Sequence, residues 1–267
     1  MTVSSVYEEN KIWLTLDVEE LLDSNFNLLP RPDFSDVDYE KMIDNWIEFC
    51  AKLKMKSTCF VLGSFAQKYP KIIKKLSDAD FEIASHGFDH RLVYKISLDE
   101  WEQSIVKAKT ILEDLTGREI GGYRAASWSM PFENSYYEIL AKNGYSFSSS
   151  YMPFKTYMYG QSEDKKLPFE VETKFGNITE IPLPKCGVPF SGGFYLRVLP
   201  LLLQKVLFKK LENERVKPVI YIHPYELNQK NLMRFYLNKI HLNLDFFLAF
   251  YSIKNPLKKI SYLCRQS

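Results

Sequence analysis

The chain has 267 residues, of which 46% are hydrophobic and 25% charged, and its 35 basic residues nearly balance 33 acidic ones. The net charge of +2 argues against a nucleic-acid partner, which would require a basic excess on some face. The four cysteines are scattered without a CxxC pair, and the N-terminal residues contain no secretory signal. No stretch is long and apolar enough to form a transmembrane segment. We therefore expect a cytoplasmic protein with reduced thiols.

Strand-like and helix-like segments alternate along the chain. In chain order, the residue types predict a strand over 11–18, a helix over 38–55, a strand over 57–63, a helix over 64–76, a strand over 81–85, a helix over 98–116, a strand over 121–126, a helix over 133–144 and a strand over 218–223. Ser97 and Glu100 form a capping box at the start of the third helix, and Gly117 is its natural stop. Repeated strand–helix units indicate an α/β fold with mostly parallel strands covered by helices. Because no linker or repeat interrupts the pattern, we expect a single domain over residues 1–267.

Two segments in the second half are less regular. Residues 151–195 are rich in proline, glycine and aromatic residues, which predicts an elaborated loop region rather than a second core. Residues 197–213 have the pattern of an apolar helix with Lys209 and Lys210 near its end. Packing on the core is the favoured interpretation of this helix, and weak contact with a membrane surface is the alternative.

Polar residues follow four of the predicted strands. They are Asp17, Glu19 and Glu20 after the first strand, His86 and His90 after the third, Arg124 after the fourth, and His223 after the last. In parallel barrels the loops after the strands carry the active site. The i, i+4 spacing of His86 and His90 places both imidazoles on one face of a helical turn, close enough to share a metal ion. Two surface histidines without a metal are the alternative.

These residue types suit metal-dependent hydrolysis. Neutral imidazoles and a carboxylate are ligands for zinc or a similar divalent ion, which would bind a water molecule and lower its pKa. A second carboxylate could act as a general base and His223 as a general acid. Arg124 could orient that base and lower its pKa, or could simply hold two strand ends together. His223, at the end of a buried strand, could also be a core histidine.

A series of short motifs runs along most of the chain, from about Trp13 to Tyr225: LTLDVEE, TCFVLG, EIASHGFDH, GYRAASWS, EIPLP, PFSGGFYLR and IHPYEL. In this order the motifs resemble those of the polysaccharide deacetylases with a NodB-homology domain, which form carbohydrate esterase family 4. Within that family the chain is most similar to the intracellular-type members whose first motif reads DVE. The resemblance implies a distorted (β/α) barrel of about seven parallel strands and a metal-dependent hydrolase that removes an acyl group from an N-acylated sugar.

The same resemblance implies roles for individual residues. His86 and His90 match the metal-binding histidines of the family, and Asp17 matches its catalytic base. Arg124 matches the arginine that orients the base, and His223 the histidine that protonates the departing amine. The residues expected to face the substrate are Ser127, through a backbone N–H, together with Trp128, Phe190, Gly192, Gly193 and Phe194. The implied cofactor is a divalent metal ion, with zinc as the first choice.

The first motif departs from the commonest form of the family, which has two adjacent aspartates. Val18 stands where the second aspartate, a metal ligand, would be. Because side chains alternate along an extended segment, Glu19 should lie on the same side as Asp17. We therefore expect Glu19 to supply the carboxylate ligand, with Glu20 as the lesser candidate.

The expected function is removal of an acetyl group from an N-acetylated sugar. Without an export signal, a nucleotide-linked or lipid-linked intermediate of surface-polysaccharide biosynthesis, or an oligosaccharide, fits better than a wall polymer. One alternative is a hydrolase of non-peptide C–N bonds in a cyclic amide or ureide on the same fold. The other is a catalytically decayed carbohydrate-binding protein, since Ala125, Ala126 and Ser148 or Ser149 stand where prolines and an aspartate are usual in the family. The oligomeric state, including a homo-oligomer, is left open.

Overall fold

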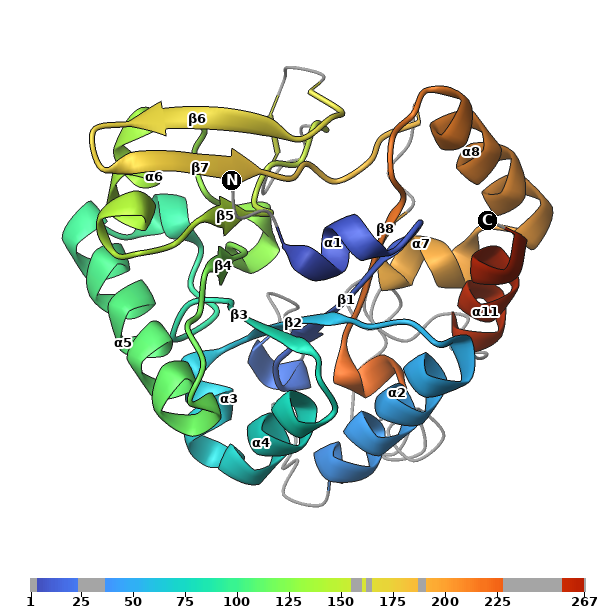
Figure 1. Cartoon of the computed structure of the whole chain (residues 1–267), viewed down its shortest axis with the longest axis horizontal. Helices are drawn as coiled ribbons and strands as arrows, with labels where there is room; N and C mark the ends of the chain where they lie inside the picture. Colours follow the sequence, from blue (N-terminus) through green and yellow to red (C-terminus); the bar gives the residue numbers. More distant parts are fainter. Residues whose placement is uncertain are drawn as a thin grey trace, which may run out of the picture.

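A single curved sheet organises the molecule. The computed structural model describes residues 4–23, 37–154, 160–161, 165–186, 191–227 and 256–266. Within them, eight strands pair in the order β6-β7-β5-β4-β3-β2-β1-β8 (Figure 1). The strands are β1 (Trp13–Val18), β2 (Thr58–Val61), β3 (Glu82–Ser85), β4 (Gly122–Tyr123), β5 (Phe147–Ser148), β6 (Phe169–Thr173), β7 (Gly176–Glu180) and β8 (Val219–Ile222).

The strand directions agree with the expected fold. Every neighbouring pair from β7 to β8 is parallel, and only β6 runs antiparallel, on β7 at the sheet edge. The two end strands, β6 and β8, do not pair with each other in the described part of the chain, so the barrel is open and distorted. The prediction of a distorted barrel with about seven parallel strands is therefore confirmed.

Helices cover the outside of the sheet (Figure 1). They are α2 (Tyr39–Leu53), α3 (Gly63–Lys68), α4 (Pro70–Asp78), α5 (Leu98–Thr116), α6 (Asn134–Lys142), α7 (Gly193–Val198), α8 (Leu201–Asn213) and α11 (Pro256–Gln266). Short 3-10 turns are η1 (Leu21–Asp23), η2 (Val93–Lys95), η3 (Ala126–Trp128) and η4 (Pro224–Glu226). The first helix, α1 (Ser5–Glu9), lies at the barrel end where the strands begin, because Val6 and Tyr7 pack with Trp13 of the inner cluster.

The alternation of side chains along β1 divides the core into two layers. Leu14, Leu16 and Val18 point outward and pack with the covering helices. The inner layer is a separate cluster that includes Trp13, Phe60, Ala84, Trp128, Phe147, Ile181, Val219 and Tyr221. Since the side-chain period of a strand is two, the inward face of β1 continues from Trp13 through Thr15 to Asp17. Asp17 is thereby buried inside the barrel, at the end where the strands finish.

Several predicted elements are confirmed, and α5 is the best example. Ser97 caps its first turn in a capping box with Glu100, and Gly117 ends it in the left-handed conformation at φ 64°. The helix expected over 64–76 is two helices, because Pro70 has no N–H to continue α3 and instead begins α4. The apolar segment 197–213 is likewise divided at Leu199 and Pro200 between α7 and α8.

The prediction of an elaborated loop over 151–195 is wrong in part. Residues 169–180 form the β6–β7 hairpin, which extends the sheet at its edge. The segment resembles a loop in sequence because Glu170 and Glu172 of the edge strand are exposed and break the apolar run.

Among the described helices, none is both long and apolar enough to cross a bilayer.

Candidate active site

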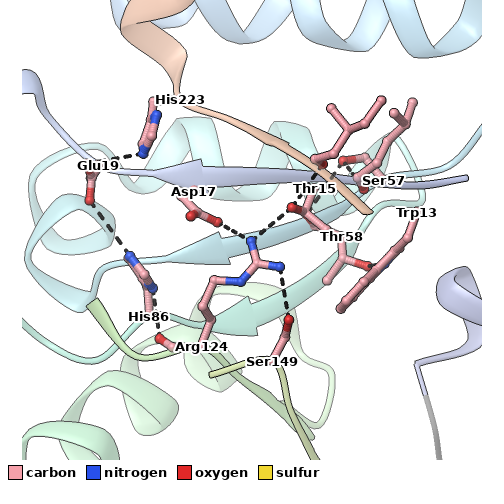
Figure 2. Close-up of polar contacts among 12 residues, drawn as sticks. Trp13, Thr15, Asp17, Glu19, Ser57, Thr58, His86, Arg124, Ser149 and His223 are labelled. Carbon is pink, nitrogen blue, oxygen red and sulfur yellow. Dashed lines mark hydrogen bonds and ion pairs between the residues drawn. The ribbon is translucent and has the colours of Figure 1, made fainter. Parts of the chain in front are cut away.

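Glu19 enters the barrel directly after β1. Val18, the last residue of the strand, is fully buried in the outer core, and the alternation turns Asp17 and Glu19 together to the inner side. Figure 2 shows Glu19 between His86 and His223, with Asp17 directed towards Arg124. The placement of Glu19 on the same side as Asp17 follows the sequence-based expectation.

Glu19, His86 and His90 form a compact group of potential metal ligands. One donor atom from each of the three lies within 4.8 Å of the others. Glu19 Oε2 lies 3.1 Å from Nε2 of His90 and 3.8 Å from Nε2 of His86. The expected helical turn is wrong, because residues 86–92 form an irregular loop after β3 in which Gly87 has φ 82°. The loop brings the two rings to a centroid distance of 5.5 Å.

The hydrogen bonding of His86 tests whether these residues fit a metal ion. Its Nδ1 lies 2.8 Å from the main-chain oxygen of Arg124. A carbonyl oxygen can only accept a hydrogen bond, so Nδ1 carries the proton and Nε2 presents a lone pair towards Glu19. Glu19 Oε2 is itself buried and accepts no hydrogen bond from the described residues. With Glu19 ionised, its Oε2 and the Nε2 of His86 are two electron-rich atoms that face each other in a buried site, and this arrangement fits a bound divalent cation. A backbone partner on the outer nitrogen is usual for a metal-bound histidine.

Burial sets the protonation of the three groups. It lowers the pKa of His86 to about 4 and that of His90 well below its usual value, which keeps both imidazoles neutral. Burial also raises the pKa of Glu19 to about 8, against the lowering effect of the nearby His223. Neutral imidazoles are the form that binds metal ions, and a buried carboxylate is stabilised in its charged form by a cation.

Glu20, the lesser candidate for the carboxylate ligand, is directed elsewhere. Its Oε1 accepts hydrogen bonds from Lys68 Nζ at 2.8 Å and from the Tyr69 hydroxyl at 2.7 Å. Its backbone N–H donates to Asp23 at 2.9 Å in the η1 turn. The structure therefore groups Glu19, and not Glu20, with the two histidines.

Asp17 and Arg124 form a buried ion pair next to this group (Figure 2). The Asp17 Oδ1 atom accepts a hydrogen bond from Arg124 Nη1 at 2.6 Å, and both side chains are almost completely inaccessible. The same guanidinium donates to Thr15 at 2.9 Å and to Ser149 at 3.2 Å. It also lies 3.9 Å from the ring centroid of Phe60 in the inner layer. These contacts fix Arg124 and, through it, the direction of the Asp17 carboxylate.

His223 lies on the other side of Glu19 from His86 (Figure 2) and is held by Glu226. Its Nδ1 is 3.0 Å from Glu226 Oε2, and its Nε2 is 3.8 Å from Glu19 Oε1. Burial alone would lower the pKa of His223, but the hydrogen bond to Glu226 and the negative charges of Glu19, Glu226 and Asp17 raise it to about 9. No role was predicted for Glu226 from the sequence. Its spacing from His223 is that of a capping box, and the structure contains this capping box.

Ser127 and Trp128 lie on the strained turn after Arg124. Both have φ 50°, in the left-handed region that residues other than glycine rarely adopt, and such strain is often found at functional sites. Trp128 packs against Tyr221 with ring centroids 4.4 Å apart and is 6% exposed. Contact of these two residues with a substrate stays a prediction.

Gly192 and Gly193, expected to flank a sugar, pack closely on the end of β8. A Cβ atom at Gly192 would lie 2.1 Å from the Tyr221 hydroxyl, and one at Gly193 would lie 2.0 Å from the Glu226 carboxylate. Both positions therefore need glycine for close approach. Phe194 follows at the start of α7 and is half-buried, whereas Phe190 lies outside the described residues. A substrate contact by this segment also stays a prediction.

An open α/β barrel with histidines, carboxylates and an arginine at its strand ends has the side chains that a hydrolase active site requires. A family model described as polysaccharide deacetylase matches residues 8–148, and the chain belongs to this family. A second model, described as a domain of unknown function (DUF3473), matches residues 149–266.

The relatives of known name match only part of the chain. A peptidoglycan deacetylase of Helicobacter pylori is 27% identical over 110 residues, which cover 41% of this chain and 37% of the relative. A peptidoglycan-N-acetylglucosamine deacetylase of Bacillus cereus is 35% identical over 63 residues, which cover 24% of this chain and 23% of the relative. The chain thus aligns with well under half the length of these proteins.

Solved structures show the same fold over nearly the whole chain. A protein of Mycobacterium smegmatis assigned to the polysaccharide deacetylases is 19% identical and has a TM-score of 0.60, with 99% of this chain and 86% of the other covered. Puue allantoinase is 14% identical with a TM-score of 0.57, over 98% of this chain and 87% of the other. A carbohydrate esterase family 4 pseudoenzyme of Bacillus anthracis is 13% identical with a TM-score of 0.51, over 97% of this chain and 62% of the other. Because the names of these three proteins indicate different activities, the shared fold alone does not define what this chain does.

Proposed function

We propose that the chain is a metal-dependent N-deacetylase that acts on an N-acetylated sugar. The observation that carries this proposal is the convergence of Glu19, His86 and His90 within 4.8 Å, next to the buried Asp17–Arg124 pair. Membership of the polysaccharide deacetylase family supplies the substrate class. The three ligand candidates favour hydrolysis over a decayed binding protein, because Glu19 provides the carboxylate that Val18 cannot.

The side chains divide the reaction between them. Glu19, His86 and His90 would hold a divalent metal ion, with zinc as the first choice, and such an ion supplies a Lewis acid that polarises the acetyl carbonyl and acidifies water. Asp17, oriented by Arg124, takes the proton from the attacking water. A backbone N–H near Ser127 helps to stabilise the developing oxyanion. His223 gives a proton to the sugar nitrogen as the C–N bond breaks, which releases acetate and the amine.

The carrier of the sugar is a finer part of the proposal. We place the substrate among nucleotide-linked or lipid-linked N-acetyl sugars. For the lipid-linked case, Val198, Leu202, Leu203 and Val206 are exposed on α7 and α8, directly after the segment expected to flank the sugar. Peptidoglycan fragments are the competing choice, since both named relatives are deacetylases of that polymer.

Three further features complete the proposal. The chain is a member of the DVE subgroup, as its first motif Asp17-Val18-Glu19 suggests. It forms one domain, because β1 pairs with β8 and α11 contacts both α2 and α7. It works in the cytoplasm, in keeping with four free cysteines.

The proposal is tested by coupling metal analysis to acetate release. Purified protein should contain one equivalent of a divalent metal and release acetate from one or more members of a panel of N-acetylhexosamines that are free, nucleotide-linked, lipid-linked or part of a peptidoglycan fragment. Allantoin and related cyclic ureides belong in the same panel. Turnover of a ureide without acetate release would replace the deacetylase by the cyclic-amide alternative, and sugar binding by metal-loaded protein without turnover would identify a binding protein.

A further inference from the structure

A second buried ion pair lies behind His223 and is not explained by metal binding. Arg197 of α7 and Glu226 of η4 face each other with Nε and Oε1 3.1 Å apart. Their side chains are 3% and 1% exposed, so the pair is as deeply buried as Asp17 and Arg124. Burial of two charges costs free energy that their attraction often fails to repay, and such a pair is therefore weak evidence for a purely stabilising role.

The two oxygens of the Glu226 carboxylate have separate partners. Oε2 lies 3.0 Å from His223 Nδ1 and accepts a hydrogen bond from the His223 backbone N–H at the same distance. Oε1 pairs with Arg197. Because a carboxylate accepts hydrogen bonds, Nδ1 carries a proton, and Nε2, the nitrogen on the side of Glu19, is the one that gives up the transferred proton. Glu226 thus fixes the rotation of His223 and keeps the remaining proton on Nδ1 once the transferred proton has left.

The position of Glu226 is itself determined by the start of α7. The single N–H of Arg197 Nε donates to the Gly193 carbonyl at 3.1 Å, so its contact with Glu226 Oε1 is an ion pair and not a second hydrogen bond. The backbone of Gly193 packs so closely on the Glu226 carboxylate that a Cβ atom there would lie 2.0 Å away. The carboxylate is therefore confined between Arg197, Gly193 and His223, with little freedom to rotate.

We propose that Glu226, held by Arg197, is a positioning residue for the proton transfer by His223. This inference rests on the proposed deacetylase function and deepens it. It also connects two parts of the chain, because the segment expected to contact the sugar, Gly192–Phe194, is fixed to the general acid through Arg197 and Glu226.

The experiment compares substrates that do and do not need an acid. An N-acetyl sugar releases an amine, which must be protonated as the C–N bond breaks, whereas para-nitrophenyl acetate releases a phenolate that leaves without a proton. In Glu226→Gln, kcat for the N-acetyl sugar should fall about a hundredfold, because a general acid that is no longer oriented loses its usual contribution to the rate. KM should change little. The rate with the aryl ester and the bound metal should stay near the wild-type values.

Two further variants keep the test decisive. Arg197→Lys retains the charge but not the planar fork, and it should show a smaller loss with the same substrate dependence. Glu82→Gln is the control: it removes a partly buried carboxylate that accepts hydrogen bonds from Ser4 and Thr58 at the opposite end of the barrel, and it should leave both rates within about twofold, as for a distant independent site. If Glu226→Gln does not fold, the positioning role is tested by Arg197→Lys alone, through its loss of rate with the N-acetyl sugar compared with its loss of rate with the aryl ester.

The outcomes separate the inference from the function. Equal losses on amide and ester, or an unchanged amide rate in folded Glu226→Gln or Arg197→Lys, would overturn the positioning role and leave the deacetylase proposal standing. A wild-type protein that carries metal and releases no acetate from any N-acetyl sugar would overturn both.

Discussion

The main-chain oxygen of Arg124 accepts the hydrogen bond from Nδ1 of His86, at 2.8 Å. The guanidinium of the same arginine donates to Asp17 at 2.6 Å. One residue therefore organises both halves of the site: its backbone orients a candidate metal ligand, and its side chain orients the candidate base. The backbone contact does not depend on the side chain, so a substitution can separate the two roles.

Arg124→Lys is expected to retain metal and lose rate. A lysine keeps the positive charge near Asp17 but cannot donate to Thr15 and Ser149 from one planar group. The carbonyl that holds His86 remains, so metal content should equal that of the wild type. We expect kcat to fall at least about tenfold, because a misdirected base loses part of its contribution. Measurement of kcat and metal content in the same preparation checks this, and metal-depleted protein would contradict the division of roles.

His86→Ala should abolish metal binding and turnover together. His223→Ala is the control, since it removes a histidine that lies near Glu19 but is outside the three-ligand group, and it should keep the metal. Metal bound at a hundred times its Kd stabilises the wild type by about 2.7 kcal/mol. Removal with a chelator should therefore lower its melting temperature by about 5–10 °C. His86→Ala should show no such shift, and a chelator-sensitive melting temperature in this variant would place the metal elsewhere.

Asp17→Asn tests the base. The amide keeps the shape of the side chain and can still accept a hydrogen bond from Arg124, but it cannot take a proton. We expect metal content to be unchanged and kcat to fall at least about a hundredfold, the usual contribution of a general base. Thermal denaturation should accompany the kinetics, because Arg124 loses its buried counter-charge. Wild-type turnover by the metal-loaded Asp17→Asn variant would show that another group is the base.

The sequence predicted the parts of this molecule that depend on local rules. Strict alternation along β1 indicated that Glu19 joins Asp17, and the capping box of Ser97 with its glycine stop at Gly117 located α5 to the residue. Contacts between distant segments were not readable in this way. The Arg197–Glu226 pair joins residues from two motifs whose proximity only the folded chain creates.

Two errors have different physical causes. The spacing of His86 and His90 matches a helical turn, yet Gly87 adopts φ 82° and a loop produces the same convergence. The β6–β7 hairpin was missed because an edge strand buries one face only and can carry glutamates on the other. Sequence periodicity indicates which residues are buried, so it is a weak signal for an edge strand such as β6, which buries little of its surface.

Glu19→Gln and Glu20→Gln form a matched pair for the carboxylate ligand. Glu19 is buried beside the histidines, and its loss should weaken metal binding by more than about a hundredfold, beyond what outer contacts contribute. Glu20 forms a partly exposed pair with Lys68, so its loss should change stability by no more than about 1 kcal/mol and leave the metal in place. Competition with a chromophoric chelator gives both affinities. The reverse ranking would transfer the ligand role to Glu20.

Val18→Asp restores the two adjacent aspartates of the commonest first motif, yet it should not restore a ligand. Val18 points into the outer core, away from the histidines, and is fully buried there. An unpaired carboxylate at this position should lower the free energy of unfolding by at least about 3 kcal/mol. Val18→Thr, which has nearly the same volume and no charge, controls for packing and should cost much less. In a Glu19→Gln background, Val18→Asp should leave metal affinity as low as Glu19→Gln alone. Recovery of binding in the double variant would mean that residue 18 can reach the metal, and that the strand does not hold its two faces apart.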